Sequence, residues 1–208
     1  MAIKFSKNEI LEMIENAKFD IRSFYKQDFV NYAGKTKDSK EYYTEIIAEW
    51  LLSHVDLFNK IKLINREGSY RIESHDGKII NQESNRAEEK IAMKLFDYSQ
   101  NKGEIFDKIG KIIDYQTPLK NIQTDDAGKI DLLAYNEDTD TLRILELKKS
   151  DSKETMLKCL LEVYTYLKIV NKVKLLKDFG LPKDTIVKAS PLVFFEGMQY
   201  KEMQEDRK

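Results

Sequence analysis

The sequence predicts an α/β chain of the α+β type, in which helices flank a mixed central sheet and a mainly helical extension precedes it. Two observations indicate this class. Apolar residues recur at helical spacing through most of residues 1–80. From residue 84 the pattern changes to helix, three strands, helix, strand. We therefore expect a helical extension with a small β-hairpin over 1–80, an αβββαβ core over 84–195 and a C-terminal tail over 196–208.

Composition limits what this fold can do. With 208 residues, 41% of them hydrophobic, the chain can bury one sizeable core or one core with a small subdomain. No apolar run approaches bilayer length and the N-terminus lacks the apolar block of a signal peptide, so we expect a cytoplasmic protein with no membrane contact. The lone Cys159 excludes an intrachain disulfide and is expected to pack within a helix. A net charge of −1 provides no general basic field, so any nucleic-acid site must be local.

The N-terminal extension is expected to hold two helices and a hairpin. Ser6 and Glu9 have the spacing of a capping box, and the apolar residues after them follow a helical period. A polar stretch over 33–40 predicts a loop, and a second amphipathic helix is expected over about 41–58. The Asp76-Gly77 turn after Gly68 indicates a small β-hairpin. We expect packing, rather than chemistry, from this half of the chain.

The core begins with a helix over Arg86–Tyr98, for which Ser84 or Asn85 is the expected cap. Its apolar stripe contains Glu88, whereas Glu89 points away from it. An acid on a buried face either extends to the edge of that face or is held there by a cation, because an unpaired buried charge is costly. Next to the strands that follow, we favour the cation.

Two strands after the expected strand Lys111–Leu119 carry the most informative residues. Gly128–Tyr135 and Thr141–Lys148 are separated by turn-forming residues, which predicts a hairpin. If Asn136 lies opposite Thr141, Asp131 lies opposite Glu146, with Cβ atoms roughly 4.5–5.5 Å apart. Two carboxylates so placed repel each other, and a hard divalent cation with oxygen ligands would relieve the repulsion.

A long helix is expected from Ser150, with Asp151 and Glu154 at capping-box spacing. Glu162 and Tyr166 lie at the edge of its apolar face. They form either a polar shoulder beside the core or a functional position, and the sequence favours neither interpretation over the other. Lysines such as Lys149 and Lys153 form either a solvated face or a local positive surface for a polyanion. A last strand is expected over Val187–Phe195, where Pro191 indicates an edge or a bulge.

Strand alternation places Glu146 and Lys148 on one face and Leu147 on the other. Two carboxylates for a metal with an ammonium beside them suit phosphodiester hydrolysis, in which the metal activates water and the lysine deprotonates the nucleophile or screens developing charge. Another arrangement, in which His54, His75 and Asp76 imitate a metal phosphohydrolase, is disfavoured because His75 and Asp76 precede a turn glycine.

Asp131 is followed by fourteen residues and then by Glu146-Leu147-Lys148. With these residues at this spacing, residues 84–195 resemble the PD-(D/E)XK nuclease superfamily, in which a restriction-endonuclease-like fold is usual. Ile130 stands where the family's naming proline would be. Family members commonly carry a glutamate on the preceding helix, matched here by Glu88. One branch has a Gln and a Tyr four residues apart on the following helix, where this chain has Glu162 and Tyr166.

The resemblance implies a Mg²⁺- or Mn²⁺-dependent nuclease that acts on nucleic acid, more often DNA than RNA. It implies metal binding by Asp131, Glu146, the Leu147 carbonyl and Glu88, with Lys148 as base or charge stabiliser. Substrate contacts could come from Glu162, Tyr166, Lys149 and Lys153, and double-strand cutting would suit a homodimer. Two alternatives stay open: a nuclease-fold binding or assembly module that does not cleave, and a metal-dependent hydrolase of small phosphate esters.

Overall fold

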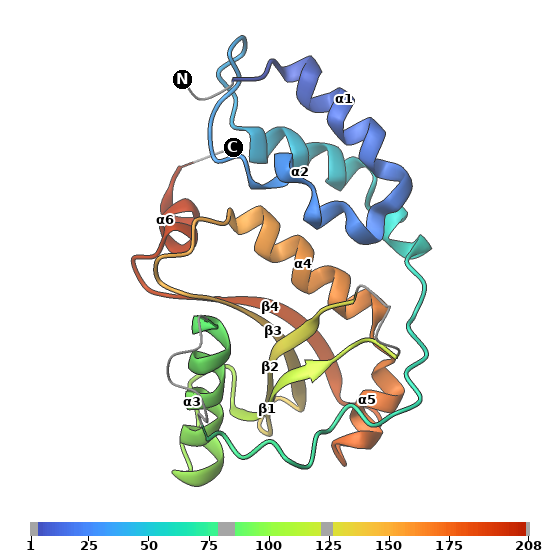
Figure 1. Ribbon diagram of the computed structural model, residues 1–208, viewed down its shortest axis with the longest axis vertical. Helices are drawn as coiled ribbons and strands as arrows, with labels where there is room; N and C mark the ends of the chain where they lie inside the picture. Colours follow the sequence, from blue (N-terminus) through green and yellow to red (C-terminus); the bar gives the residue numbers. More distant parts are fainter. Residues whose placement is uncertain (1–3, 79–85, 122–126, 207–208) are drawn as a thin grey trace.

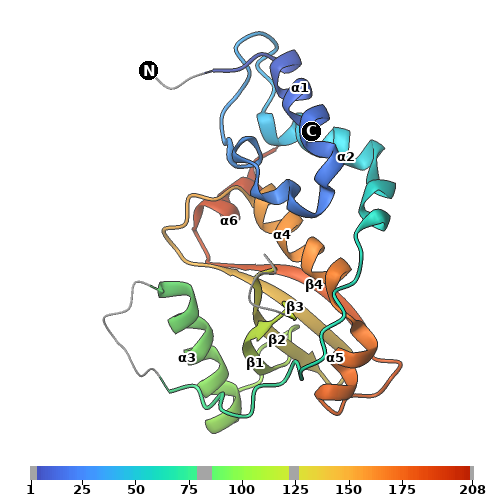
Figure 2. The same cartoon turned by 45° about the vertical axis from the view of Figure 1, so that its right-hand side comes forward.

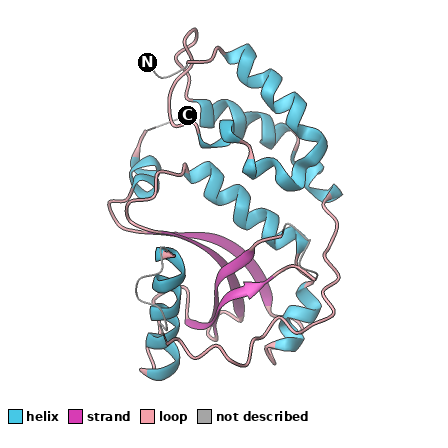
Figure 3. Ribbon diagram, in the orientation of Figure 1, coloured by secondary structure: helices cyan, strands magenta, loops and turns pink. Residues whose placement is uncertain are grey.

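The computed structural model describes residues 4–78, 86–121 and 127–206, and its fold is α+β with a four-stranded mixed sheet flanked by helices (Figures 1 and 3). The predicted α+β class is therefore confirmed, and the core elements follow the predicted order along the chain, with the addition of α5 before the last strand. In chain order the helices and strands are α1 (Lys7–Ala17), the 3₁₀ helices η1 (Lys18–Lys26) and η2 (Asp28–Asn31), α2 (Tyr43–Ser53), the 3₁₀ helix η3 (Val55–Lys60), α3 (Ala87–Asn101), β1 (Lys111–Pro118), β2 (Lys129–Asn136), β3 (Thr141–Lys148), α4 (Met156–Ile169), α5 (Lys172–Asp178), β4 (Ile186–Val193) and α6 (Met198–Gln204).

The sheet has the order β1-β2-β3-β4, with the first three strands antiparallel and β4 parallel to β3. β4 is an edge strand, as Pro191 predicts, because proline cannot donate to a neighbour on both sides. The hairpin register is also confirmed, since Asn136 pairs with Thr141. The paired positions end at Leu132 and Leu145, so Asp131 and Glu146 come next, at the point where β2 and β3 cease to pair.

Helix α4 lies between two layers, with the sheet on one side and the N-terminal helices on the other (Figures 1 and 2). This position explains why the face predicted for α4 is partly wrong. Tyr166, expected at the edge of the apolar face, is only 4% exposed, whereas the apolar Leu160 is 50% exposed. A helix buried on two sides has no single apolar stripe. Helix α3 covers the opposite face of the sheet (Figure 2).

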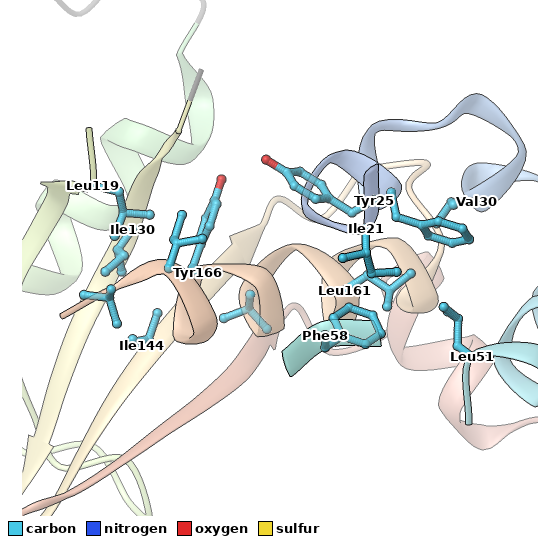
Figure 4. Close-up of a cluster of buried hydrophobic side chains, with 14 of the residues drawn as sticks. Ile21, Tyr25, Val30, Leu51, Phe58, Leu119, Ile130, Ile144, Leu161 and Tyr166 are labelled. Atoms are coloured by element: carbon cyan, nitrogen blue, oxygen red, sulfur yellow. The ribbon is translucent and has the colours of Figure 1, made fainter. Parts of the chain in front are cut away.

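The N-terminal helices and the sheet share one hydrophobic core. A continuous cluster of buried side chains runs from Ile10 in α1 to Ile144 in β3 and Leu176 in α5, and Figure 4 shows its middle part around α4. The predicted capping box of α1 is present, with Glu9 accepting from the Ser6 amide. The expected caps of α3, Ser84 and Asn85, lie outside the described residues. Among the described helices, none combines the length and the apolarity needed to cross a membrane.

Three local expectations are wrong. Residues 61–78 contain no strand, so the hairpin expected between Gly68 and Gly77 is absent. Other segments take its backbone groups: the Tyr70 amide, for example, donates to the Asp178 carboxylate at 2.8 Å. The helix expected from Ser150 begins at Met156, with Thr155 as its cap. The expected tail contains α6, where buried Gln199 donates to the Glu154 carbonyl at 2.6 Å.

Candidate functional site

Lys148, the last residue of β3, is surrounded by three carboxylates. Its Nζ lies 2.7 Å from Glu146 Oε1, 2.8 Å from Glu154 Oε2 and 3.4 Å from Glu162 Oε2. The predicted face is confirmed, because Glu146 and Lys148 point together toward α4 while Leu147 packs in the cluster under α3. The Lys148 and Glu146 side chains are each 6% exposed. An ammonium with three acidic neighbours is thus held almost entirely away from water.

Asp131 lies beside this group and is held by two donors. Its Oδ2 accepts from the Leu147 amide at 2.9 Å, and its Oδ1 accepts from Gln116 Nε2 at 2.9 Å. The bond to Leu147 crosses from β2 to β3 beyond their last paired residues and so replaces a ladder hydrogen bond with a side-chain bond. This arrangement fixes the Asp131 carboxylate at the split between the two strands.

Gln116 has a left-handed backbone, with φ of 49°, inside β1. A residue other than glycine held in this region costs of order 1–3 kcal/mol and persists only where its surroundings require it. A bulge between Ile112 and Asp114 also interrupts β1 before this point. The strand is thus bent where it presents Gln116 to Asp131, a feature often found beside functional sites.

Glu88 reaches the same place from the first turn of α3. Its Oε1 accepts from the Lys149 amide at 3.1 Å, which joins α3 to the end of β3. Glu88, Gln116, Asp131 and Lys149 border one cavity of about 310 Å³. Glu89 was expected to point away but borders this cavity too. Glu146 and Lys148 do not border it; they lie deeper, toward α4.

Burial dominates the electrostatics of the two central acids. Burial raises the pKa of Asp131 to about 6, although the Leu147 amide and Lys148 act against the shift. Burial also raises the pKa of Glu146 well above its ordinary value, and the charge of Asp131 adds to the effect. The charge of Asp131 thus acts on Glu146 in the direction that the predicted repulsion requires.

Lys148 stays an ammonium ion. Burial alone would lower its pKa, but the charges of Glu146 and Glu162 and hydrogen bonds to Glu146 and Glu154 raise it above the ordinary value. Of the two roles left open by the sequence, base or charge stabiliser, the raised pKa favours the charge stabiliser.

Tyr166 connects the site to the helical extension. Its hydroxyl donates to Glu162 Oε1 at 2.9 Å, so it holds the third carboxylate around Lys148. Its ring meets that of Tyr25 in η1 edge to face, with centroids 6.2 Å apart. Figure 4 shows the two hydroxyl oxygens on the same side of α4. The polar-shoulder interpretation of Glu162 and Tyr166 is thus incomplete, because both belong to the Lys148 group.

Sequence reasoning missed Gln116 and gave Glu154 the wrong role. Glu154 was expected to cap a helix, but it accepts from Lys148 and also pairs with Lys158. Burial would raise its pKa, yet these two lysines lower it overall. Neither role has a local signal, because each depends on a partner from another element.

Other predicted residues lie apart from the site. Lys153 is exposed in the loop before α4, and Lys149 Nζ pairs with Asp151 at 3.3 Å. His54 stacks on Trp50, whereas His75 binds Asp114, so they do not form the alternative metal site. Burial raises the pKa of Cys159 to about 12, which agrees with its expected packing role.

The donor set suits a hard divalent cation. Asp131, Glu146 and Glu88 supply carboxylate oxygens, the ligand type that Mg²⁺ and Mn²⁺ prefer. In the ranges 4–78, 86–121 and 127–206, no three His, Cys, Asp or Glu side chains are grouped closely enough to hold a metal ion. The carboxylates instead bind protein donors, namely Gln116, Lys148 and two backbone amides. The ligand types thus suit a metal, but among the described residues these carboxylates are held by protein donors and are not grouped around a common point.

Comparisons of this chain with protein-family models, with curated proteins and with solved structures found no match in any of the three.

Proposed function

We propose that this chain is a metal-dependent nuclease with a restriction-endonuclease-like core, which hydrolyses phosphodiester bonds in nucleic acid, with DNA as the main substrate. The observation that carries the proposal is the pair of buried acids, Asp131 and Glu146, at the split between β2 and β3 with the Lys148 ammonium beside them. Such a pair is unfavourable in a folded protein unless a function requires it.

Asp131, Glu146, the Leu147 carbonyl and Glu88 would hold Mg²⁺ or Mn²⁺. When bound, the ion supplies a water of lowered pKa and neutralises charge on the phosphate. The chain supplies the rest: Gln116 and the Leu147 amide orient the Asp131 carboxylate, and the Lys149 amide orients Glu88. Lys148 contributes a fixed positive charge where negative charge develops on the phosphate oxygens.

Glu154, Glu162 and Tyr166 act as positioning residues in this scheme. Glu154 and Glu162 accept from the Lys148 ammonium, and the Tyr166 hydroxyl donates to Glu162, so that Lys148 stays at the end of β3. The cavity beside Asp131 also contains Arg86 and Lys149, which are suited to phosphate oxygens next to the reacting bond.

One observation favours a second function, a nucleic-acid-binding or assembly module that does not cleave. Lys148 and Glu146 are each only 6% exposed, and three carboxylates already satisfy the ammonium. A site closed in this way would support binding without hydrolysis.

A cleavage assay separates the two. The protein is incubated with single- and double-stranded DNA and RNA with Mg²⁺, Mn²⁺ or EDTA, beside Lys148→Met and Asp131→Asn. The nuclease proposal expects cleavage by wild type with metal and a loss of about 10²-fold or more in both variants. Cleavage that survives both substitutions would refute the site, and binding without cleavage would favour the module.

Metal binding gives an independent measurement. Titration calorimetry with Mn²⁺ should show binding to wild type that Asp131→Asn weakens strongly, because one carboxylate charge is removed. Asp151→Asn is a matched control, since Asp151 is 76% exposed and outside the carboxylate group. If wild type binds no Mn²⁺, the reason given for the buried acids fails.

A further inference from the structure

A second cavity, about 410 Å³ in volume, lies in the helical extension between η1 and the end of η3. Four basic residues border it, Lys18, Arg22, Lys60 and Lys62, against one acid, Asp20. This local balance contrasts with the net charge of −1 of the whole chain. The Asp20 carboxylate is engaged by the Ser23 amide at 3.3 Å, so the acid is used within η1.

The basic groups differ in how far they are neutralised. Lys18 pairs with Glu15. In the described part of the chain, Lys60 and Lys62 form no ion pair, and both are exposed. These two lysines therefore offer unbalanced positive charge at the cavity.

Phe19 projects from the same cavity. At 86% exposed it is the most exposed large apolar side chain in the described residues. Its neighbour Asp20 departs from helical geometry (φ −118°, ψ 71°), which kinks η1 immediately after the ring. An aromatic ring left in water next to lysines is costly unless a partner covers it, and it offers a face on which a flat ligand can stack.

Buried side chains connect η1, which borders this cavity, with the group around Lys148. Tyr25, near the other end of η1, contacts Tyr166, which binds Glu162 beside Lys148. Lys26, which is exposed, lies with its Nζ 5.7 Å from the Tyr25 ring centroid and adds a cation at this end of η1.

We propose that the surface formed by Phe19, Lys60 and Lys62 binds single-stranded nucleic acid. The lysines contact phosphates, and the Phe19 ring stacks on an unpaired base. Single strands fit better than a duplex because the bases of a duplex already stack on each other and hide their faces. This proposal rests on the nuclease function only for the fate of the bound strand, and binding itself is measured without cleavage.

The test measures affinity in EDTA with a fluorescein-labelled oligo(dT) of about 12 nucleotides and a duplex of equal length. Wild type should bind the single strand more tightly than the duplex. Phe19→Leu, which keeps the apolar bulk but loses the ring, should weaken single-strand binding about tenfold. The double reversal Lys60→Glu and Lys62→Glu should weaken binding and reduce the slope of log K against log salt by roughly 1.4.

Two controls keep the outcome specific. The double reversal Lys94→Glu and Lys183→Glu changes the net charge equally at exposed lysines on other elements, and should change affinity much less. Phe195→Leu removes another exposed ring, 73% exposed, and should leave binding unchanged. If the two double reversals weakened binding equally, the affinity would depend on the net charge of the protein and not on this surface, and the proposal would be overturned.

The remaining outcomes separate the two proposals. Oligonucleotide binding that depends on Phe19, with no cleavage in Mg²⁺ or Mn²⁺, supports this surface and refutes the nuclease. Cleavage with no effect of Phe19→Leu or the Lys60 and Lys62 reversal refutes this surface and leaves the nuclease. Competition by a polyglutamate peptide as strong as that by oligo(dT) would mark a site for acidic proteins and would overturn the proposal.

Discussion

Tyr166 fills the space that a side chain at position 128 would need: a Cβ atom added to Gly128 would lie 2.4 Å from the Tyr166 hydroxyl oxygen and 3.2 Å from its Cζ. Gly128 begins the stretch that leads to Asp131, and Tyr166 holds Glu162 beside Lys148. The glycine therefore matters for the close approach of β2 to α4. Its φ angle gives no reason for glycine at this position.

Gly128→Ala should destabilise the protein by about 1–3 kcal/mol, because the buried Tyr166 ring has little room to move. Urea denaturation measures the change. The same substitution made in Tyr166→Phe should cost much less, since the atom at 2.4 Å is gone. Additive effects of the two substitutions would show that the predicted clash does not occur.

Asp131→Asn should stabilise the protein above pH 7. The pKa of Asp131 is about 6 in the folded state against an ordinary 3.8, so between these values the folded state binds more protons than the unfolded state. The free energy of unfolding therefore falls as pH rises from about 4 to about 6, by at most about 3 kcal/mol. The asparagine oxygen can still accept from the Leu147 amide, and Gln116 can turn its own amide to match.

The measurement is thermal unfolding of both proteins from pH 4 to pH 8 without divalent metal. The melting curves should separate progressively across the window in which Asp131 ionises. Asp151→Asn serves as the control at an exposed carboxylate. A constant difference between wild type and Asp131→Asn at all pH values would contradict the raised pKa.

Lys148→Met should cost about 3–5 kcal/mol at pH 8, because it leaves Glu146 buried without its cation. The loss should be smaller near pH 5, where protonation of the carboxylates relieves the repulsion. Lys158→Met is the matched control: it removes another partner of Glu154 but leaves Lys148 in place. Its cost should stay below about 1 kcal/mol. An equal loss from Lys148→Met at both pH values would argue against repulsion as the cause.

His75→Ala should release the segment before α3 from the edge of the sheet. His75 Nδ1 lies 2.6 Å from buried Asp114 Oδ1, and Thr117 donates to the other carboxylate oxygen at 2.6 Å. The substitution leaves Asp114 with one donor and should cost about 1–3 kcal/mol. Hydrogen exchange should accelerate in residues 70–78, while Lys78→Ala, at an 80% exposed side chain, should not change it.

Much of the sheet could be predicted from the sequence because its determinants are local. The turn between Asn136 and Thr141 sets the register of β2 against β3, and that register brings Asp131 and Glu146 together. Alternation along β3 then places Lys148 with Glu146. The capping box of α1 is confirmed for the same reason, since Ser6 and Glu9 lie within one turn.

The remaining features depend on contacts between distant segments. The Asp76-Gly77 pair resembles a hairpin turn, but His75 binds Asp114 in β1 and the segment runs as an extended loop. Glu154 has a good local role as a helix cap, which the ammonium of Lys148 overrides. In each case a buried partner from another element contributes more than the local preference.

The hydrogen bond from Gln199 to the Glu154 carbonyl has a practical consequence for the C-terminal end. Gln199 also donates to the Ser152 carbonyl, so α6 supports the backbone of residues 152–154. The Glu154 side chain in this segment holds Lys148. Shortened versions that end before Met198, or affinity tags that pull α6 away, would disturb the carboxylates around the ammonium without altering any residue of the site. If such a protein were inactive, the cause would be the loss of α6 and not a fault in the proposed site residues.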